Sequence, residues 1–392
     1  MSSSSRVRLT RLRETTYGAL PTAAAMTVVR RTGGVFSHES TINSSAEVRS
    51  DLMVTDNARE DYQAKGAIED EWTFGTHHPE LQDVFGNTLS ATINLSSLSL
   101  SVVASAGTYT RGSGSWITDG LVVGGVYNFG GLSNSGNNGR KRLVALTATV
   151  ATVAYTSGMV DEGPTASCTV TQGGHFRMGT NVYSSIFEEL YADISSSEIW
   201  QYRGGVCTGW NWKFTHPGKM MADWSYECAA AYENAATAGN GTVTDYTAVR
   251  VMNSIDHFRA FYEGGAASTL RVKEMSIAYA APKRRILAAG TLGNVDMGAN
   301  TYGFTGSLKV YNSVAARTVA AKHKAGTLTA LEWETVDSAG NCYHFYTPVA
   351  VYKSGSPAAG PKDSDVYIDL PWLASRDSVT ATMFQLTVFP AS

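Results

Sequence analysis

The clearest pattern along the chain is an alternation of apolar and polar positions that breaks off after short segments. Residues 64–74 (AKGAIEDEWTF) alternate strictly, which predicts a β-strand. Its two faces carry Ile68, Asp70, Trp72 and Phe74 on one side, and Ala67, Glu69, Glu71 and Thr73 on the other. The next segment, 77–87, predicts a short helix with Pro79 in its first turn and Gly86 at its C-terminal stop.

The same plan occurs a second time, 240 residues further along the chain. Tyr62-x3-Gly66 opens the first strand, and Tyr302-x3-Gly306 opens the second. A helical stretch then stops at Gly86 in the first case and at Gly326 in the second. Each half reads as strand, long loop, strand, short helix and three strands. A chain built twice on one plan usually forms a ring, a stack or a pseudo-symmetric dimer.

The strand signals divide the chain into three parts. Residues 99–175 are dense in Gly, Ser, Thr and Val, give almost no helix signal, and predict a small inserted β module. Residues 1–98 and 176–245 form the first domain around it, and an Ala/Gly/Thr-rich loop (234–248) precedes the second domain, 246–392. The predicted fold is mainly β, with two tandem sandwich or barrel domains, one short helix in each, and the inserted module.

Two long connections are the main candidates for function, because a long loop inside a compact domain usually has one. Residues 39–62 combine charged residues with an apolar centre, and residues 281–300 form the matching irregular connection of the second half. We expect both to dock on neighbouring subunits, with apolar residues as anchors and charges setting the register; a mobile surface loop is the alternative. The candidates are Glu39, Glu47, Arg49, Asp51, Leu52, Met53, Asp56, Arg59, Lys283, Arg284 and Arg285.

Composition agrees with a β-rich protein and limits its partners. The chain has 392 residues, 38 of them Gly, with only 17% charged residues and a net charge of −3, which gives no footprint for tight nucleic-acid binding. No apolar run reaches the ~18 residues of a membrane span. The basic segment 1–18 has no apolar region typical of a secretory signal and is expected to be a solvated arm. The four cysteines have no metal-ligand spacing and are expected to be reduced and partly buried.

Catalytic patterns are absent from the sequence. It contains no G-x-S-x-G, H-E-x-x-H or P-loop motif. His77 and His78 have no third ligand nearby, so a surface or capping role is expected, with no metal and no cofactor. Glu69 and Glu71 share one strand face, which is either simply solvated or an acidic surface that faces something negative without binding it. The aromatic residues are expected in a core or an interface: Trp200, Trp210, Trp212, Trp224 and Tyr226.

Several segments resemble the major tail tube proteins of long-tailed bacteriophages. Ser45-Ala46-Glu47-Val48-Arg49-Ser50-Asp51, followed by Gly66 and the helix 80–85, is similar to the family's Ser/Asn-x-Glu-x-Arg-x-Asp element, Gly-started strand and aromatic-rich helix. Residues 187–214 resemble the acidic strand that leads to a Phe/Tyr-x-Gly-x-x-Val pattern, with the valine displaced to Val206. The insert resembles a small β module that some members carry, and the second half matches mainly in layout. Residues 250–265 and those beyond 375 have no counterpart.

The resemblance implies a structural, non-enzymatic protein of the phage virion, assembled in the host cytoplasm. Family members form rings that stack into a tube, through which DNA passes without sequence-specific binding. With two repeats in one chain, three chains make a pseudo-six-fold ring, with Glu69 and Glu71 as lumen candidates. The implied partners are the chain itself, a tape-measure protein, and terminator or tip proteins. Two alternatives remain: another tail ring component, such as a terminator or baseplate ring, or a carbohydrate-binding β-sandwich.

Overall fold

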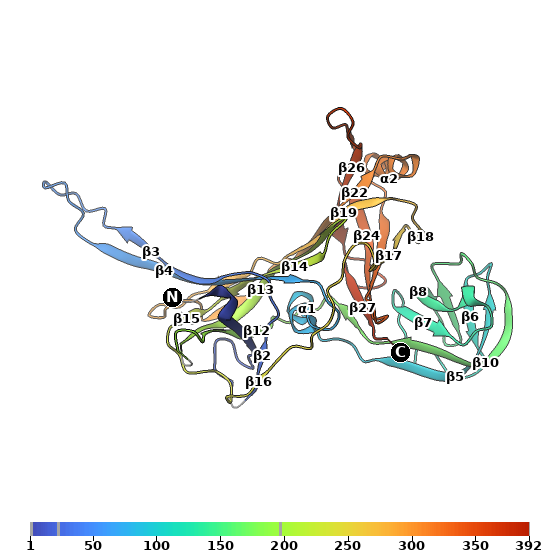
Figure 1. Cartoon of the computed structure of the whole chain (residues 1–392), viewed down its shortest axis with the longest axis horizontal. Helices are drawn as coiled ribbons and strands as arrows, with labels where there is room; N and C mark the ends of the chain where they lie inside the picture. Colours follow the sequence, from blue (N-terminus) through green and yellow to red (C-terminus); the bar gives the residue numbers. More distant parts are fainter. Residues whose placement is uncertain (1–2, 22–23, 196–197, 392) are drawn as a thin grey trace.

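The computed structural model describes residues 3–21, 24–195 and 198–391, and it is mainly β (Figure 1). The first part of the chain contains β1 (Val7–Arg13), β2 (Met26–Val28), β3 (Phe36–Ser44), β4 (Asn57–Glu71) and α1 (His78–Phe85). After the insert, the chain continues with β11 (His175–Arg177), β12 (Ser184–Tyr191), β13 (Ile199–Thr215), β14 (Met220–Cys228), β15 (Ala230–Tyr232) and β16 (Val243–Thr244). Short 3-10 turns cover Ser4–Arg6 and Ser135–Asn137.

The second part of the chain begins with β17 (Phe258–Glu263), β18 (Ala266–Ala267), β19 (Val272–Ala280), β20 (Arg284–Ile286) and β21 (Asp296–Gly298). It then has β22 (Gly303–Tyr311), α2 (Val314–Ala325), β23 (Thr329–Val336), β24 (Cys342–Tyr352), β25 (Pro357–Ala358), β26 (Tyr367–Ser375) and β27 (Gln385–Phe389). Both helices end where the sequence predicts, because Gly86 and Gly326 take the left-handed conformation at the two C-termini.

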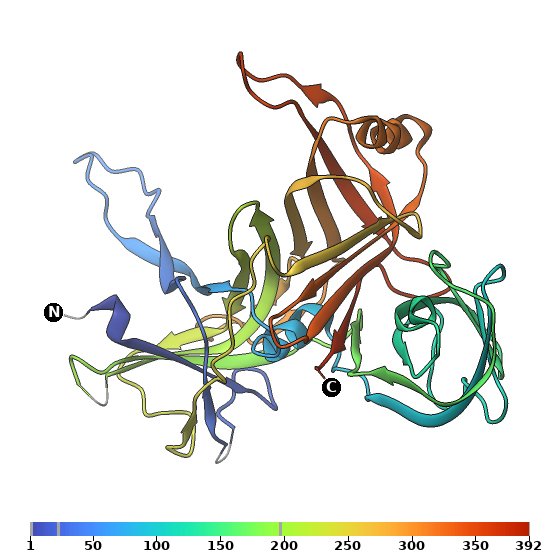
Figure 2. The same ribbon diagram turned by 45° about the vertical axis from the view of Figure 1, so that its right-hand side comes forward.

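A separate closed barrel lies between the two parts of the first region. Its strands pair in the cyclic order β10-β5-β6-β9-β8-β7. They are β5 (Ile93–Val103), β6 (Thr108–Arg111), β7 (Val126–Gly130), β8 (Gly139–Leu146), β9 (Val150–Val153) and β10 (Glu162–Gln172). The barrel has its own apolar core around Tyr109, Trp116 and Phe129, and Figure 2 shows it beside the main sheets.

Outside the barrel, the strand order is the same in the two halves. The first half pairs in the antiparallel order β1-β12-β13-β14-β4-β3. The second half pairs in the antiparallel order β17-β23-β24-β26-β22-β19. In both halves the helix follows the fifth strand of this order, β4 or β22. The repeated sequence pattern therefore corresponds to a repeated topology.

The two halves join edge to edge through β13 and β19. Gly209–Thr215 pair antiparallel with Glu274–Ala280, which makes one sheet in the order β3-β4-β14-β13-β19-β22-β26-β24. Alternate residues of these strands are buried on one face, and the opposite face is polar. The buried face contributes to a single core shared by both halves, where the rings of Trp212 and Trp333 stack 6.2 Å apart.

Two expectations from the sequence are wrong. The basic N-terminal segment is not a solvated arm, because β1 pairs with β12 over its full length and Leu9 to Leu12 are buried. Arg11 is accommodated because its guanidinium lies 2.9 Å from Glu80 and 2.5 Å from Asp83 of α1. Residues 39–62 are not an irregular loop either. They form most of the hairpin β3–β4, whose tip is residues 45–56, and Figure 1 shows it projecting away from the rest of the molecule.

The segments without a sequence assignment also have defined places. Residues 250–265 contain β17, the first strand of the second half's order, and β27 beyond residue 375 is buried along its whole length. The connection 281–302 is partly regular, since β20 and β21 pair as a small hairpin. All four cysteines are free thiols and buried. Trp210, Trp212, Trp224 and Tyr226 lie in the core as expected, whereas Trp200 is half-buried.

Candidate assembly surfaces

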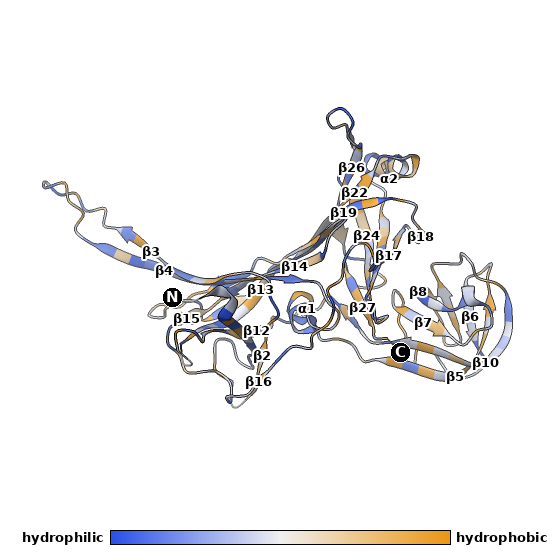
Figure 3. Cartoon of the chain, in the orientation of Figure 1, coloured by the Kyte–Doolittle hydropathy of each residue, from blue (hydrophilic) through white to orange (hydrophobic). Residues whose placement is uncertain are grey.

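The outer part of the hairpin β3–β4 is exposed on every side. Each residue from Glu39 to Glu60 is exposed, including all eight candidates that the sequence places there. The tip concentrates apolar side chains in solvent: Leu52 is 94% exposed, and Val48, Met53 and Val54 accompany it. Figure 3 shows orange positions on this projecting ribbon. Apolar side chains presented on a projecting hairpin are typical of a surface that binds another protein.

Charged residues give the tip a defined local structure. The Arg49 guanidinium lies 2.7 Å from Asp51, and this pair holds the pKa of the Asp51 carboxyl below its usual value. Asp51 also accepts a hydrogen bond from the Met53 backbone N–H at 3.2 Å. Glu47 accepts one from the Thr55 hydroxyl at 2.8 Å. The charges therefore shape the turn that presents Leu52 and Met53.

The second predicted loop anchors the hairpin at its base. Arg285 binds Asp61 through two hydrogen bonds of 2.6 and 2.9 Å, and this bidentate contact lowers the pKa of the Asp61 carboxyl. Arg285 also lies 3.6 Å from Glu227 of β14. It therefore serves a contact within the chain, whereas Arg284 is exposed and Lys283 is half-buried. The structure brings Arg285 to the hairpin, far from Leu52 and Met53 at the tip.

The polar face of the joined sheet is the second candidate surface. Glu69 is exposed and Glu71 is half-buried on this face of β4, opposite the buried Ile68 and Trp72. The lysines of the face are each paired with a carboxylate: Lys213 with Asp223, Lys219 with Glu71, Lys309 with Glu274, and Lys65 with Glu39. Paired lysines attract polyanions less strongly than free ones, so these four pairs weaken the attraction of the face for a phosphate backbone.

The inserted barrel is held against the second half by two arginines, Arg140, which is half-buried, and Arg142, which is buried. Arg140 of β8 makes a bidentate contact with Glu334 of β23, both bonds being 2.8 Å. Two residues on, Arg142 lies 2.9 Å from Glu332 and stacks over the ring of Tyr346. Residues two apart on a strand lie on the same face, so the two arginines share one face of β8 and the two glutamates share one face of β23. Each arginine therefore meets one glutamate.

This contact contains groups with displaced pKa values. Burial raises the pKa of Glu332 to about 7, although Arg142 beside it acts in the opposite direction. Burial lowers the pKa of His344 to about 4, and its ring lies 3.6 Å from Glu332. Burial also acts to raise the pKa of Glu334, but the bidentate Arg140 overcomes this and holds it low. We therefore expect the stability of the barrel contact to depend on pH.

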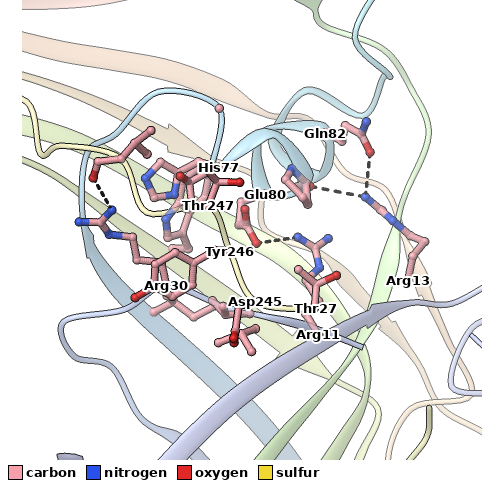
Figure 4. A pocket seen from close by; sticks show the side chains of 18 of the residues that line it. Arg11, Arg13, Thr27, Arg30, His77, Glu80, Gln82, Asp245, Tyr246 and Thr247 are labelled. Carbon is pink, nitrogen blue, oxygen red and sulfur yellow. Dashed lines mark hydrogen bonds and ion pairs between the residues drawn. The ribbon is translucent and has the colours of Figure 1, made fainter. Parts of the chain in front are cut away.

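A pocket of about 730 Å³ lies between β1, β2, α1 and residues 245–249 (Figure 4). Its arginines are engaged within the chain: Arg11 with Glu80, Arg13 with Gln82 at 3.3 Å, and Arg30 with the Val249 carbonyl at 3.0 Å. These cations hold the N-terminal strands and the 245–249 segment in place. The pocket therefore has the character of a structural junction.

His77 occupies the N-cap position of α1, but it does not lie on the surface as expected. His77 is buried, stacks on Trp72 with the ring centroids 5.1 Å apart, and makes no side-chain capping bond to α1. Burial lowers its pKa to about 3, so it is neutral at physiological pH and its 3.6 Å contact with Asp70 is not an ion pair. In the part of the chain that the structure describes, no three His, Cys, Asp or Glu side chains form a group able to hold a metal.

Sequence reasoning missed the residues that fix the barrel and the N-terminal strand. Arg140 and Arg142 were available as a signal, because RKR in one strand and EWE in another are complementary at a spacing of two. Arg11 was hidden in a basic segment whose apolar positions, Leu9 and Leu12, mark it as a strand with a buried face. The molecule thus combines a polar sheet face, an apolar hairpin tip and a duplicated β topology.

A comparison with protein families matches residues 4–374 to the phage tail tube protein family. The match covers nearly the whole chain, so the chain belongs to this family. A comparison with curated proteins finds no match. The protein is therefore a structural, non-catalytic component of a phage tail, and it assembles with other tail proteins into the tube. No helix among the described residues is long and apolar enough to cross a membrane.

Proposed function

We propose that three copies of this chain close into a ring and that the rings stack to form the tail tube. Each chain supplies two tail-tube domains, 1–98 with 176–245 and 246–392, and the module 99–175 is inserted into the first. A ring of three such chains has pseudo-six-fold symmetry. The single observation that carries the proposal is the identical strand order of the two halves, joined edge to edge in one sheet.

Ring closure follows from the need to cover sheet edges. The joined sheet ends at β3 in the first half and at residues 352–358 of β24–β25 in the second, and each of these edges presents backbone groups. A closed ring pairs all such edges, because every chain then has a neighbour on both sides. Sheet edges that are complementary by internal repetition favour a closed ring over an open aggregate.

The polar face of the joined sheet then lines the lumen, with Glu69 and Glu71 on it. This face has its lysines paired with carboxylates, so a passing polyanion finds few free cations. DNA passes through without sequence-specific binding, and the tape-measure protein occupies the same channel during assembly. Assembly takes place in the host cytoplasm.

Stacking of the rings uses the hairpin β3–β4. Its length and its exposed apolar tip suit insertion against the neighbouring ring, with Leu52 and Met53 as anchors. The charges along the hairpin set its orientation: Glu39, Glu47, Arg49, Asp51, Asp56 and Arg59. Arg284 and Lys283 lie near the hairpin base and are the second contact candidates, while Arg285 holds that base in place.

Negative-stain electron microscopy of the concentrated wild-type protein tests the proposal. Hollow tubes with a regular axial repeat and three-fold rings are the expected result. Closed rings that never stack identify a terminator or baseplate component instead. A chain that stays monomeric at every concentration, even with tail-tip proteins added as initiators, contradicts the proposal.

Deleting the inserted barrel tests whether it belongs to the tube wall. Ile93 and Gln172 are paired neighbours at the start of β5 and the end of β10, so a short linker can replace residues 93–172. The deletion leaves two buried carboxylates without their arginines, so it is combined with Glu332→Gln and Glu334→Gln. Tubes that form normally place the barrel outside the wall. Loss of tubes, with the doubly substituted full-length chain still assembling, makes the barrel part of it.

A further inference from the structure

Every second residue of β3 directs its backbone N–H and C=O groups toward the outer edge of the strand, away from β4. The Ala67 and Glu69 N–H groups bond to the carbonyls of Val35 and Gly33, so residues 33 and 35 face β4. Residues 34, 36 and 38 therefore direct their backbone groups to the other side. Within the described residues, β4 is the one strand that pairs with β3. The Phe36 carbonyl on the open side accepts a bond from the Tyr202 hydroxyl at 3.3 Å.

The strand that corresponds to β3 in the second half is β19, and its matching edge is covered. Phe36 lies opposite Gly66 in the hairpin, and Ile277 lies opposite Gly306 in the same position of the repeat. The Ala281 N–H bonds to the Thr208 carbonyl at 2.9 Å, so the odd-numbered residues of β19 face β13. Phe36 and Ile277 therefore direct their backbone groups toward the same edge of the repeat. In β19 this edge pairs with β13.

The strand that corresponds to β13 in the second half is β24 with its continuation β25. β13 has β14 on one side, and on the other it has β12 followed by β19. β24 has β27 followed by β26 on one side and β23 on the other, but β23 reaches only to Ala350. Beyond that point, residues 352–358 pair only with β26 among the described residues. β19 pairs with the second part of β13. The equivalent part of β24–β25, residues 352–358, is thus open on that side among the described residues.

We propose that residues 33–39 of one chain pair antiparallel with residues 352–358 of the next chain, repeating between chains the contact that β13 and β19 make within one. The partner is a second copy of this chain, and the inference rests on the proposed ring. The geometry also gives the register. Gly66 lies opposite Tyr226 and Gly306 opposite Trp372, which places Pro357 where Trp212 lies in the first half.

In this register Pro357 lies opposite Phe36, as Trp212 lies opposite Ile277. A proline has no N–H to donate, so the Phe36 carbonyl would otherwise lose its partner in the new pairing. That carbonyl already accepts the Tyr202 hydroxyl. The Tyr202 hydroxyl therefore supplies the one hydrogen bond that Pro357 cannot donate to the Phe36 carbonyl. This is a second match between the two edges, independent of the alignment that gives the register.

The next residue pair provides the test, since Ser356 then lies opposite Ser37. The corresponding pair within the chain is Asn211 and Ala278. It is a non-hydrogen-bonded pair, in which Cα atoms lie about 4.5 Å apart and a disulfide fits. Ser37 and Ser356 are both exposed, whereas the four native cysteines are buried and shielded from mild oxidation.

The experiment oxidises assembled Ser37→Cys/Ser356→Cys protein and separates it on a non-reducing gel. Covalent dimers and trimers are expected, and neither single variant should give them. Asn211→Cys/Ala278→Cys is the matched control, which should close within the chain and run as a compact monomer. Ser37→Cys/Ser354→Cys tests the register, because it is displaced by two residues on the same face and should crosslink far less.

The outcomes separate this contact from the proposed ring. Rings or tubes that give no crosslink between chains, while the Asn211/Ala278 control closes, overturn the seam and leave the proposed function standing. Preferred crosslinking of Ser37 with Ser354 overturns the register. Wild-type protein that forms neither rings nor tubes with initiator present overturns the proposed function and the seam with it.

Discussion

The two halves of the chain share a strand order but differ at their edges. In the second half, β19 is covered by β13, and the connection to β22 folds back as the small hairpin β20–β21. In the first half, the corresponding strands β3 and β4 extend into a long exposed hairpin. The duplicated core keeps its pairing, and the divergence is concentrated where one copy has a partner in its own chain and the other does not.

The two helices differ in a related way. α1 buries Glu80 and Asp83 against Arg11, whereas the buried side of α2 consists of Ala316, Val319 and Ala320. α1 therefore combines the apolar packing of Leu81, Val84 and Phe85 with charges supplied by the N-terminal strand, and α2 depends on close packing of small side chains. The same element of the repeat is stabilised by two kinds of interaction, which experiments can separate.

The largest expected effect concerns the exposed hairpin. Leu52→Glu/Met53→Glu should abolish tube formation, because it places two charges at the apolar tip that we propose to dock on the next ring. Both side chains are exposed in the monomer, so its free energy of unfolding should change by less than about 0.5 kcal/mol. Electron microscopy and urea denaturation measure the two quantities. Ile117→Glu, on the exposed surface of the inserted barrel, should assemble normally.

The next effect breaks the charge network of α1. Arg11→Met leaves Glu80 and Asp83 buried without their main cation and should cost about 3–5 kcal/mol of stability. Arg317→Met on the exposed side of α2 is the control and should change stability by less than about 0.5 kcal/mol. Equal midpoints in urea for both variants would show that the two helices do not differ in this way.

The matched glycines should respond alike. A Cβ at Gly66 would lie 2.1 Å from the Phe36 ring, and one at Gly306 would lie 2.3 Å from the Trp372 ring. Gly66→Ala and Gly306→Ala should therefore each cost about 1–3 kcal/mol through overpacking. Gly303→Ala, in the same strand as Gly306, meets no atom within 4 Å and is the control. Denaturation followed by tryptophan fluorescence gives the comparison, and a tolerated alanine at either glycine would contradict it.

The smallest expected effect is a pH dependence of stability that arises at the contact between the barrel and the second half. The folded-state pKa of Glu332 is raised to about 7, so its contribution to stability is complete below the unfolded pKa and is lost as the pH rises through 7. His344 acts in the opposite direction, because its pKa is lowered to about 4 and its contribution is lost as the pH falls.

Comparison of variants separates the two groups. The stability of Glu332→Gln relative to wild type should rise by on the order of 2 kcal/mol between pH 5 and pH 8. Glu334→Gln should show the opposite sign and at lower pH, because Arg140 holds the pKa of Glu334 below its ordinary value of 4.5, so that its contribution is complete above that pH and is lost as the pH falls below it. Urea midpoints at several pH values measure both, and parallel pH profiles for the two variants would refute the assignment.

The sequence predicted the strands best where one face is buried. The alternation at Ile68, Asp70 and Trp72 identified the buried face of β4, although the strand runs over Asn57–Glu71 and not 64–74, and the glycine stops placed both helix ends. It failed at the hairpin, because residues 39–60 have no buried face in the monomer and thus no apolar alternation to detect. A strand that is held only by backbone hydrogen bonds to its partner has no characteristic pattern of residue types.

Charged residues account for the other failures. Arg11 in the N-terminal segment is buried, although charge usually indicates solvent, and Asp70 is buried as well, on the apolar face where the alternation of β4 places it. Burial raises the pKa of Asp70 to about 7, so this carboxyl is partly neutral in the folded protein. The partners that permit such burial lie far away in sequence, as Asp83 does for Arg11, and local pattern does not reveal them.

The β13–β19 contact also affects the kinetics of assembly. If rings form as proposed, every second seam around the ring is already made within a folded monomer, at an effective concentration far above that of free chains in a cell. Fewer encounters between separate molecules are then needed to close a ring. The concentration dependence of ring formation should be less steep than for a tube built from six single-domain subunits, and fusion of two subunits into one chain becomes a means of accelerating nucleation.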